Sequence, residues 1–194
     1  MDVRAKILSE ATRLFARKGV DATSLQEISD AVGVRKPSLL YHFPSKDALH
    51  HGVLQSVISH LSESLPRLLK AAAREDRFDA ILDETIHFFA ADPDRARLLL
   101  REALDRPAEM RKLLEAGALS WMGLLADSIR KAQAEGLMRP EADPEVWLLQ
   151  VIHLVVGTFT SGPILQTLVG KNSKTVDQRL LTELKRAARA SIMR

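Results

Sequence analysis

The sequence predicts an all-α protein, with a small N-terminal helix-turn-helix domain and a larger C-terminal helical domain, about nine helices in all. Three observations lead to this prediction. Apolar residues recur at spacings of three and four along nearly the whole chain, which is the period of a helix with one buried face. Prolines and glycines stand where these periodic segments begin and end. No segment alternates apolar and polar residues as a half-buried strand does.

The first three helices are short and have clear boundaries. The first ends at Lys18-Gly19, where a cation in the last turn is followed by glycine. Ser24 and Glu27 have the spacing of a capping box, which predicts the start of the second helix. Gly33 permits the left-handed turn that follows it, and Pro37 suits the first turn of the third helix.

Proline also marks the boundaries of the later helices. Pro44 ends the third helix, and Ser45 caps a fourth that runs to about residue 73 and that Pro66 should kink. The remaining helices are predicted at residues 78–91, 93–105, 107–135, 144–169 and 175–193. We place the domain boundary at residue 50, which gives a DNA-binding candidate domain of residues 1–50 and a helical domain of residues 51–194.

Bulk composition excludes several classes of protein. The chain has 194 residues, 46% of them hydrophobic, and no cysteine, so disulfides and cysteine-ligated zinc or iron–sulfur sites are excluded. The first residues lack the apolar core of a signal peptide, and no run reaches the ~18 apolar residues of a membrane span. We therefore expect a cytoplasmic protein with no membrane partner. The net charge of +3 is too small to indicate a partner by itself.

The second and third helices have the arrangement by which proteins present a helix to the major groove of DNA. Two short helices meet at a steep angle around one glycine. The exposed face of the third helix carries side chains that can bond phosphates and base edges: Arg35, Lys36, Ser38, Tyr41 and His42. A solvated helix face could carry the same residues, but Val34, Leu39 and Phe43 already fill the inward positions, which favours DNA contact.

Each of these residues has a predicted role. Lysine can donate to guanine O6 and N7, so Lys36 is the candidate for reading a base. Tyr41 and His42 are expected on phosphate, sugar or a thymine methyl group. Lys46 lies in the first turn of a helix, where a nearby phosphate would balance its charge. The hydroxyls at Thr23 and Ser24 are first of all caps and are also candidates to hold a phosphate.

The same segment resembles the DNA-binding segment of the tetracycline-repressor (TetR) family. The resemblance covers residues 7–49 and lies in the stretch from Leu14 to Val20 and in Thr23-Ser24, Ile28, Gly33-Val34, Leu39, His42-Phe43 and the run from Ser45 to Leu49. Further on, the stretch from Gly136 to Pro140 followed by Asp143-Pro144-Glu145 is typical of the region before the family's last two helices.

Two positions depart from the family's usual pattern. The family usually has tyrosine, which reaches a phosphate, at the position of Leu40, whereas here the tyrosine is one residue later at Tyr41. Leucine cannot bond a phosphate oxygen, so that contact is in question. The family often has glycine at the position of Pro37, where proline is a common alternative that should dock against DNA in the same way.

The resemblance implies a homodimeric and usually repressing transcription factor that binds a palindromic operator in double-stranded DNA. A small molecule that enters the C-terminal domain would change the spacing of the dimer's two DNA-binding domains. By the same resemblance, the helices at 144–169 and 175–193 would form the dimer interface. The apolar face proposed for this interface consists of Leu148, Leu149, Ile152, Val155 and Val156.

Large apolar side chains of the C-terminal domain are candidates to line the ligand site, although such residues more often form a core. The apolar candidates are Phe88, Trp121, Met122, Trp147 and Phe159. His87, His153 and Thr158 are the candidate polar groups. Because this part of the chain is only weakly charged and its aromatic residues cluster, an apolar or amphiphilic effector fits better than a highly anionic one.

The rival interpretation is a helical carrier of a small molecule or metal that does not bind DNA. Glu84 and His87 have the Glu-x-x-His spacing of di-iron bundles, but the matching pair is Gln150 and His153, and glutamine is a poor iron ligand. We therefore expect no metal and no cofactor. Catalysis lacks a motif as well, because the Gly-x-Ser-x-Gly, His-Glu-x-x-His and Gly-x-Gly-x-x-Gly patterns are absent, so no enzyme is predicted.

Overall fold

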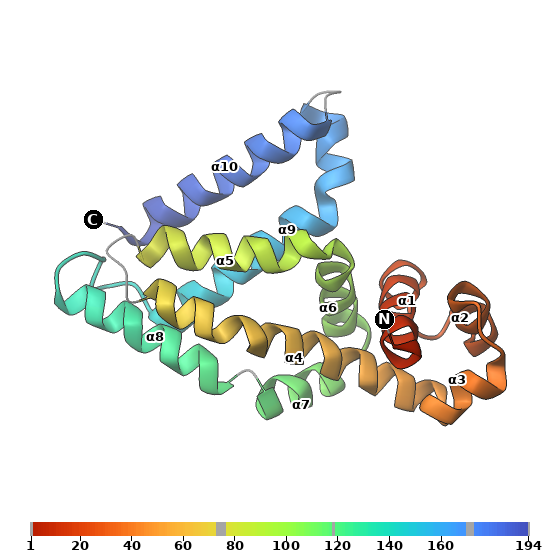
Figure 1. The fold of residues 1–194 in the computed structure, drawn as a ribbon. Coiled ribbons are helices and arrows are strands. Elements are labelled where there is room, and N and C mark those ends of the chain that lie inside the picture. Colours follow the sequence, from red (N-terminus) through yellow and green to blue (C-terminus); the bar gives the residue numbers. More distant parts are fainter. Residues whose placement is uncertain (1, 73–76, 118, 170–172, 194) are drawn as a thin grey trace.

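The computed structural model describes residues 2–72, 77–117, 119–169 and 173–193, and it is all-α over these ranges, as predicted (Figure 1). The helices are α1 (Val3–Lys18), α2 (Leu25–Val32), α3 (Lys36–His42), α4 (Lys46–Ala72), α5 (Arg77–Ala91), α6 (Pro93–Asp105), α7 (Pro107–Gly117), α8 (Leu119–Ala134), α9 (Pro144–Val169) and α10 (Ser173–Ile192). The described ranges hold no β-strand, only an isolated bridge between Met138 and Met193. None of the helices described is long and apolar enough to cross a membrane.

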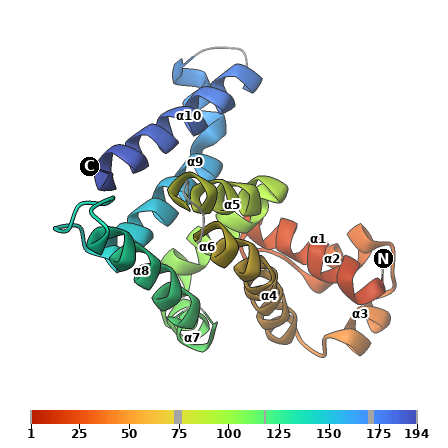
Figure 2. The same ribbon diagram turned by 60° about the vertical axis from the view of Figure 1, so that its left-hand side comes forward.

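Helices α1, α2 and α3 gather at one end of the molecule, and α4 runs from them into the larger body (Figures 1 and 2). The first turns of α4 belong to the core of the small end, because Leu49 and Val53 are fully buried there with Phe15 of α1. The later part of α4 packs against α5 and α8. One continuous helix therefore joins the two parts of the chain.

The second half of α9 and most of α10 project from the body as a pair (Figures 1 and 2). Their other ends are fixed to the body near residue 140. The Arg139 N–H donates to the Ile192 carbonyl at 2.9 Å, and the Trp147 indole N–H donates to the Ser191 hydroxyl at 2.9 Å. These bonds hold the C-terminal end of α10 against the start of α9.

The structure corrects the predicted helix at 107–135. Two helices occupy this range, with α7 ending at Gly117 and α8 starting at Leu119, so the described residues form ten helices rather than about nine. An added Cβ at Gly117 would lie 2.8 Å from Ile58 Cγ2, so glycine allows α7 to end in close contact with α4. The apolar periodicity is continuous on both sides of Gly117, so the sequence pattern predicts a single helix over residues 107–135. By contrast, α4 continues through Pro66.

We predict opposite effects on stability from alanine at two glycines. Gly33 has φ +77°, where L-residues are strained, so Gly33→Ala should lower the free energy of unfolding by about 1–2 kcal/mol. Gly123, inside α8, has open space around its Cα, and Gly123→Ala should raise stability by about 0.5–1 kcal/mol. Urea unfolding measures both. A stabilising Gly33→Ala would contradict the turn geometry.

Candidate DNA-binding site and ligand cavity

The start of α2 is fixed by side chains from both sides of its first turn. The Ser24 hydroxyl accepts the Glu27 backbone N–H at 3.0 Å, which is the predicted cap. The Lys18 ammonium binds the Glu27 carboxylate and, with the Ser24 backbone, holds the pKa of that carboxyl below its usual value. Thr23 is buried and donates to the Gly19 carbonyl at 2.7 Å. Its side chain is therefore closed to a phosphate, whereas Ser24 is exposed.

The turn between α2 and α3 has the geometry expected for a helix-turn-helix. Gly33 adopts the left-handed conformation, and the Val34 N–H donates to the Ser29 carbonyl at 2.9 Å. Leu39 is fully buried, and Phe43 is nearly so. An added Cβ at Gly52 of α4 would lie 2.8 Å from Phe43 Cε1, so this glycine admits the ring and sets how α3 docks on α4.

The outer face of α3 is free in the described structure. Arg35, Lys36, Pro37 and Ser38 are exposed, and 86% of Tyr41 is exposed. The His42 ring is half-buried and lies edge-on to the Tyr41 ring, with centroids 5.4 Å apart. Leu40 is half-buried beside them. The predicted DNA-facing residues from Arg35 to Ser38 and Tyr41 are therefore open to solvent, and His42 is partly so.

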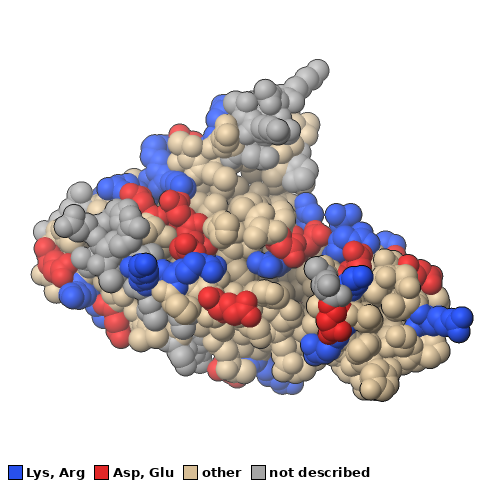
Figure 3. All heavy atoms as spheres, in the orientation of Figure 1, with Lys and Arg blue, Asp and Glu red and all other residues tan. Residues whose placement is uncertain are grey.

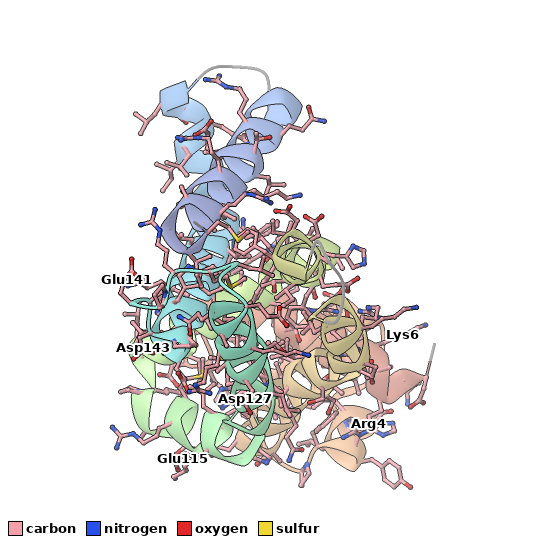
Figure 4. The ribbon with its side chains drawn as sticks, turned by 90° about the vertical axis from the view of Figure 1, so that its left-hand side faces the viewer. Arg4, Lys6, Glu115, Asp127, Glu141 and Asp143 are labelled. Carbon is pink, nitrogen blue, oxygen red and sulfur yellow. The ribbon has the colours of Figure 1, made fainter. Side chains whose placement is uncertain are left out.

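Lys46, the first residue of α4, contacts the turn after α1. Its Nζ donates to the Asp21 carbonyl at 3.0 Å, which holds the ammonium close to the start of α2. Ser45 caps α4 as predicted, since its hydroxyl accepts the Ala48 N–H at 3.0 Å. Arg4 of α1, which was not predicted from the sequence, adds a cation beside α3 (Figure 4). The Arg4 guanidinium lies 5.1 Å from the centre of the Phe43 ring.

A buried polar pair joins the DNA-binding candidate region to the body. His50 Nε2 of α4 and Glu102 Oε2 of α6 lie 2.9 Å apart, and both side chains are almost fully buried. The Phe15 ring of α1 meets the His50 ring edge-on at 6.0 Å. Glu102 Oε1 has no hydrogen-bond partner among the described residues. Neither residue was singled out from the sequence as a contact between α4 and α6, because spacing along the chain does not pair residues 52 positions apart.

The larger domain encloses an apolar cavity of about 290 Å³ between α4, α5, α6, α7, α8 and α9. Five of the eight predicted ligand residues line it: Phe88, Trp121, Met122, Trp147 and His153. Trp121 Nε1 is buried and has no partner within the described residues. Residues of α4, α6 and α7, among them Leu61, Leu99 and Met110, also line the cavity. Sequence reasoning missed these, since an apolar helix face gives one signal for core and cavity alike.

The other three predicted ligand residues lie outside the lining of this cavity. His87 is exposed and does not line the cavity, whereas the adjacent Phe88 does. The Thr158 hydroxyl donates to the Leu154 carbonyl at 2.8 Å. The Phe159 ring packs on the Phe89 ring, with centroids 6.3 Å apart. The structure thus corrects these three assignments for the cavity.

The residues predicted for the dimer interface lie mostly inside the chain. Leu148, Leu149, Ile152 and Val156 line the cavity, and Val155 is fully buried within the protomer. A partner chain cannot reach Val155, so the prediction at that position is wrong. Of the predicted residues only Leu149 is exposed, and the other exposed large apolar residues described on α9 are Val146, Leu154, Ile164 and Leu168.

A metal site has no support in the described residues. They contain no group of three His, Asp or Glu side chains placed to hold an ion. Glu84, half of the Glu-x-x-His pair, is bound by Arg67 at 2.9 Å. His87, the other half, is exposed.

Comparison with protein families assigns the chain. Residues 7–53 match the model described as bacterial regulatory proteins of the tetR family, and residues 75–186 match a tetracyclin repressor-like C-terminal domain. The chain belongs to the TetR family. The family assignment confirms the resemblance inferred from residues 7–49, and it extends the match over most of the C-terminal domain, where the resemblance lay in length, helicity, helix boundaries and the stretch before the last two helices.

Individual proteins agree with this family assignment. The TetR-family chain is 27% identical over 178 residues to the transcriptional regulator LmrA of Bacillus subtilis, with 89% of each protein covered. Two solved structures share its fold at 19% identity and a TM-score of 0.69. One is the ketosteroid regulator KstR2 of Mycobacterium tuberculosis, and the match covers 100% of this chain and 96% of the KstR2 chain. The other is AibR with isovaleryl coenzyme A and operator DNA, covering 93% and 96%.

This TetR-family protein is therefore a DNA-binding transcriptional regulator, and not an enzyme. The helix-turn-helix that the family model matches is the unit formed by α2, Gly33 and α3. The family also explains why a chain with little catalytic chemistry has both an exposed polar helix and an enclosed apolar cavity.

We predict that the buried pair between α4 and α6 contributes to stability through its hydrogen bond. Glu102→Leu leaves His50 buried without its partner and should lower the free energy of unfolding by about 1–3 kcal/mol. Glu102→Gln retains an oxygen that can accept from the ring and should cost less than half as much. Urea unfolding of both variants gives the comparison, and equal losses would mean that shape rather than hydrogen bonding holds the pair.

Proposed function

We propose that the protein represses transcription as a homodimer bound to a palindromic operator, and that an apolar or amphiphilic small molecule releases it. Residues 1–50 would form the DNA-binding domain and residues 51–194 the ligand-binding and dimerisation domain, with α4 crossing the boundary. The observation that carries the proposal is the outer face of α3, where Arg35, Lys36, Ser38 and Tyr41 are all exposed. A dimer seated on an operator occupies DNA that RNA polymerase needs, which gives repression.

The proposed DNA contacts divide by chemistry. Lys36 and Ser38 lie on the exposed first turn of α3, in position to meet base edges in the major groove. Ser24, at the N-terminus of α2, and Lys46, bound to the Asp21 carbonyl, would hold one phosphate together. Tyr41 would reach the phosphate that Leu40 cannot, because its hydroxyl end is in solvent.

The proposed dimer interface uses the outer face of the projecting α9–α10 pair. Leu154, Ile164 and Leu168 share one stripe of α9 with Gly157 and Ser161, at alternating spacings of four and three. Such apolar exposure suits an obligate interface, which usually buries ~2,000 Å² or more. Two recognition helices held in this way can be spaced the ~34–36 Å that successive major grooves require.

The proposed effector site is the apolar cavity, which adjoins α4 and α6. Support for a ligand there comes from the volume, the lining and the related structure of AibR in complex with isovaleryl coenzyme A and operator DNA. Release requires that the effector prefer one spacing of the DNA-binding domains over the other, because equal affinity for both states shifts nothing.

We predict that Lys36 and Lys46 affect DNA binding differently. Lys36→Ala should reduce discrimination at one base pair of each half-site by about 1–3 kcal/mol. Lys46→Ala should weaken binding to operator and random duplex alike and lower the slope of log K against log salt by about one. Salt titrations on both duplexes test this, with Lys112→Ala on α7 as a distant control. An unchanged slope for Lys46→Ala would remove it from the phosphate contacts.

We predict that the exposed stripe of α9 maintains the dimer. Ile164 is 68% exposed, so Ile164→Asp should leave the fold intact and convert dimer to monomer in sedimentation. Leu124→Asp on α8, at a residue 47% exposed, is the matched control and should stay dimeric. Val155→Asp should instead unfold the chain, because that residue is fully buried. A folded, dimeric Ile164→Asp protein would place the interface elsewhere.

We predict reciprocal coupling between effector and operator. A true inducer should weaken operator binding by ~1–3 kcal/mol, and the operator should weaken inducer binding by the same factor. Titrating the compound with and without operator DNA measures both directions. Equal affinity in the two titrations would exclude that compound as the inducer.

A further inference from the structure

A second hollow lies next to the apolar cavity, between α1, α6 and α9, with a volume of about 490 Å³. We call it the α1–α6 cleft. Three arginines line it, Arg17 from α1 and Arg97 and Arg101 from α6, together with Leu100, Leu104 and Thr160. Figure 3 shows Lys and Arg side chains gathered over the top of α1, with acidic side chains beside them. None of the proposed DNA contacts lines this cleft.

The arginines of the cleft carry more charge than the carboxylates near them balance. Arg97 binds Asp94 at 2.9 Å, while Arg17 approaches the same carboxylate only at 3.8 Å. Arg101 approaches Asp105 at 3.8 Å. Three guanidinium groups therefore face two carboxylates, a net charge of +1. Arg17 and Arg101 make no hydrogen bond to another side chain within the described residues, which leaves their N–H groups available to an anion.

The cleft and the cavity meet at one side chain of α6. Leu100 lines both hollows, and it is the residue that their linings share within the described chain. It is 38% exposed, and Leu104, one turn further along α6, is 73% exposed. Exposed leucines between arginines form a rim that is apolar toward the cavity and cationic toward solvent.

The cavity itself offers no place for a charged group. Its one lining carboxylate, Glu84, is held by Arg67. The Thr85 hydroxyl donates to the Ile81 carbonyl at 2.9 Å, and the His153 ring bonds the Leu149 carbonyl at 2.7 Å. The buried Trp121 indole N–H, which has no partner among the described residues, is one free donor, but the lining holds no Lys or Arg. An ionised head would therefore lose its hydration there for a single hydrogen bond to a neutral group, at a large cost. A charged group on a cavity-bound molecule must therefore lie outside, and the α1–α6 cleft is adjacent.

We propose that the effector is an amphiphile with one anionic head, a carboxylate or a phosphate, whose apolar tail fills the cavity while Arg17 and Arg101 bind the head in the α1–α6 cleft. This inference rests on the proposed function, because it assigns the effector's chemical class. It also supplies the mechanical link to DNA. The head would contact α1 of the DNA-binding region and α6 of the ligand domain together, so binding fixes the relative position of these two helices.

The test compares probes of one chain length and different heads: decanoate, decyl phosphate and 1-decanol. Both tryptophans of the chain line the cavity, so tryptophan fluorescence reports entry of the tail. We expect at least one anion to bind about tenfold tighter than decanol at low salt, an advantage that falls as salt rises. Equal affinities for all three probes would overturn the proposal, as would the absence of any fluorescence response.

Variants separate the head site from the tail site. Arg17→Gln and Arg101→Gln should each weaken binding of the preferred anion about 3–10-fold and leave decanol binding unchanged, and Arg101→Lys should recover part of the loss. Arg111→Gln, on the exposed side of α7, is the matched control. If the arginine variants lower decanol affinity equally, the cleft acts only through structure and the proposal fails.

Operator binding distinguishes this failure from failure of the proposed function. The arginine variants should bind operator DNA like the wild-type chain in the absence of amphiphile, because neither arginine belongs to the proposed DNA contacts. Loss of the anion preference with intact, probe-sensitive operator binding would overturn only the head site. A wild-type chain that binds no palindromic DNA would overturn the regulator proposal while leaving the amphiphile measurements valid.

Discussion

The packing of α4 against α1, together with the buried bond from α4 to α6, is the constraint on which the rest of the structure depends. Leu49 and Val53 of α4 are fully buried against the α1 core, and the adjacent His50 bonds Glu102 of α6 in the interior. Because α4 is a single helix, its first turns cannot move with the DNA-binding region while its later turns stay still. Any rearrangement of the cavity wall that shifts α4 or α6 therefore reaches α3.

A second, weaker contact joins the same two regions at the surface. The Asp21 carboxylate, in the turn after α1, binds Arg106 at the junction of α6 and α7 at 2.6 Å, and the Asp21 carbonyl accepts from Lys46. Since the Asp21 side chain is 93% exposed, this ion pair contributes little stability by itself. Its position matters more, because it ties the end of α6 to the residues that would hold a DNA phosphate. Buried and exposed contacts thus run in parallel between cavity and operator face.

The helix-turn-helix could be predicted from the sequence because its determinants are local. Ser24 caps α2 by accepting the backbone N–H three residues later. The turn needs a positive φ angle at position 33, which glycine adopts without strain, and Pro37 suits the first turn of α3. Most of the failures involve contacts between distant segments. The break at Gly117 reflects close approach to Ile58, and the burial of Thr23 reflects the path of the turn after α1. The His50–Glu102 pair spans 52 residues and has no signature in spacing.

Helix α9 shows why sequence could not divide cavity from dimer interface. Residues 146–169 contain no Lys, Arg, Asp or Glu, so the helix is apolar on every side and offers no periodic contrast. In the structure its faces separate: Val155 enters the core, Ile152 and Val156 face the cavity, and Leu154 and Ile164 face outward. A molecule in the cavity therefore touches the same helix that would meet a partner chain. Under the proposed assembly, a tail that displaces Ile152 or Val156 must also disturb the exposed stripe of α9, because Leu154 lies between them on the same helix. The relative placement of the two protomers would then respond to the ligand together with the α1–α6 contact within each of them.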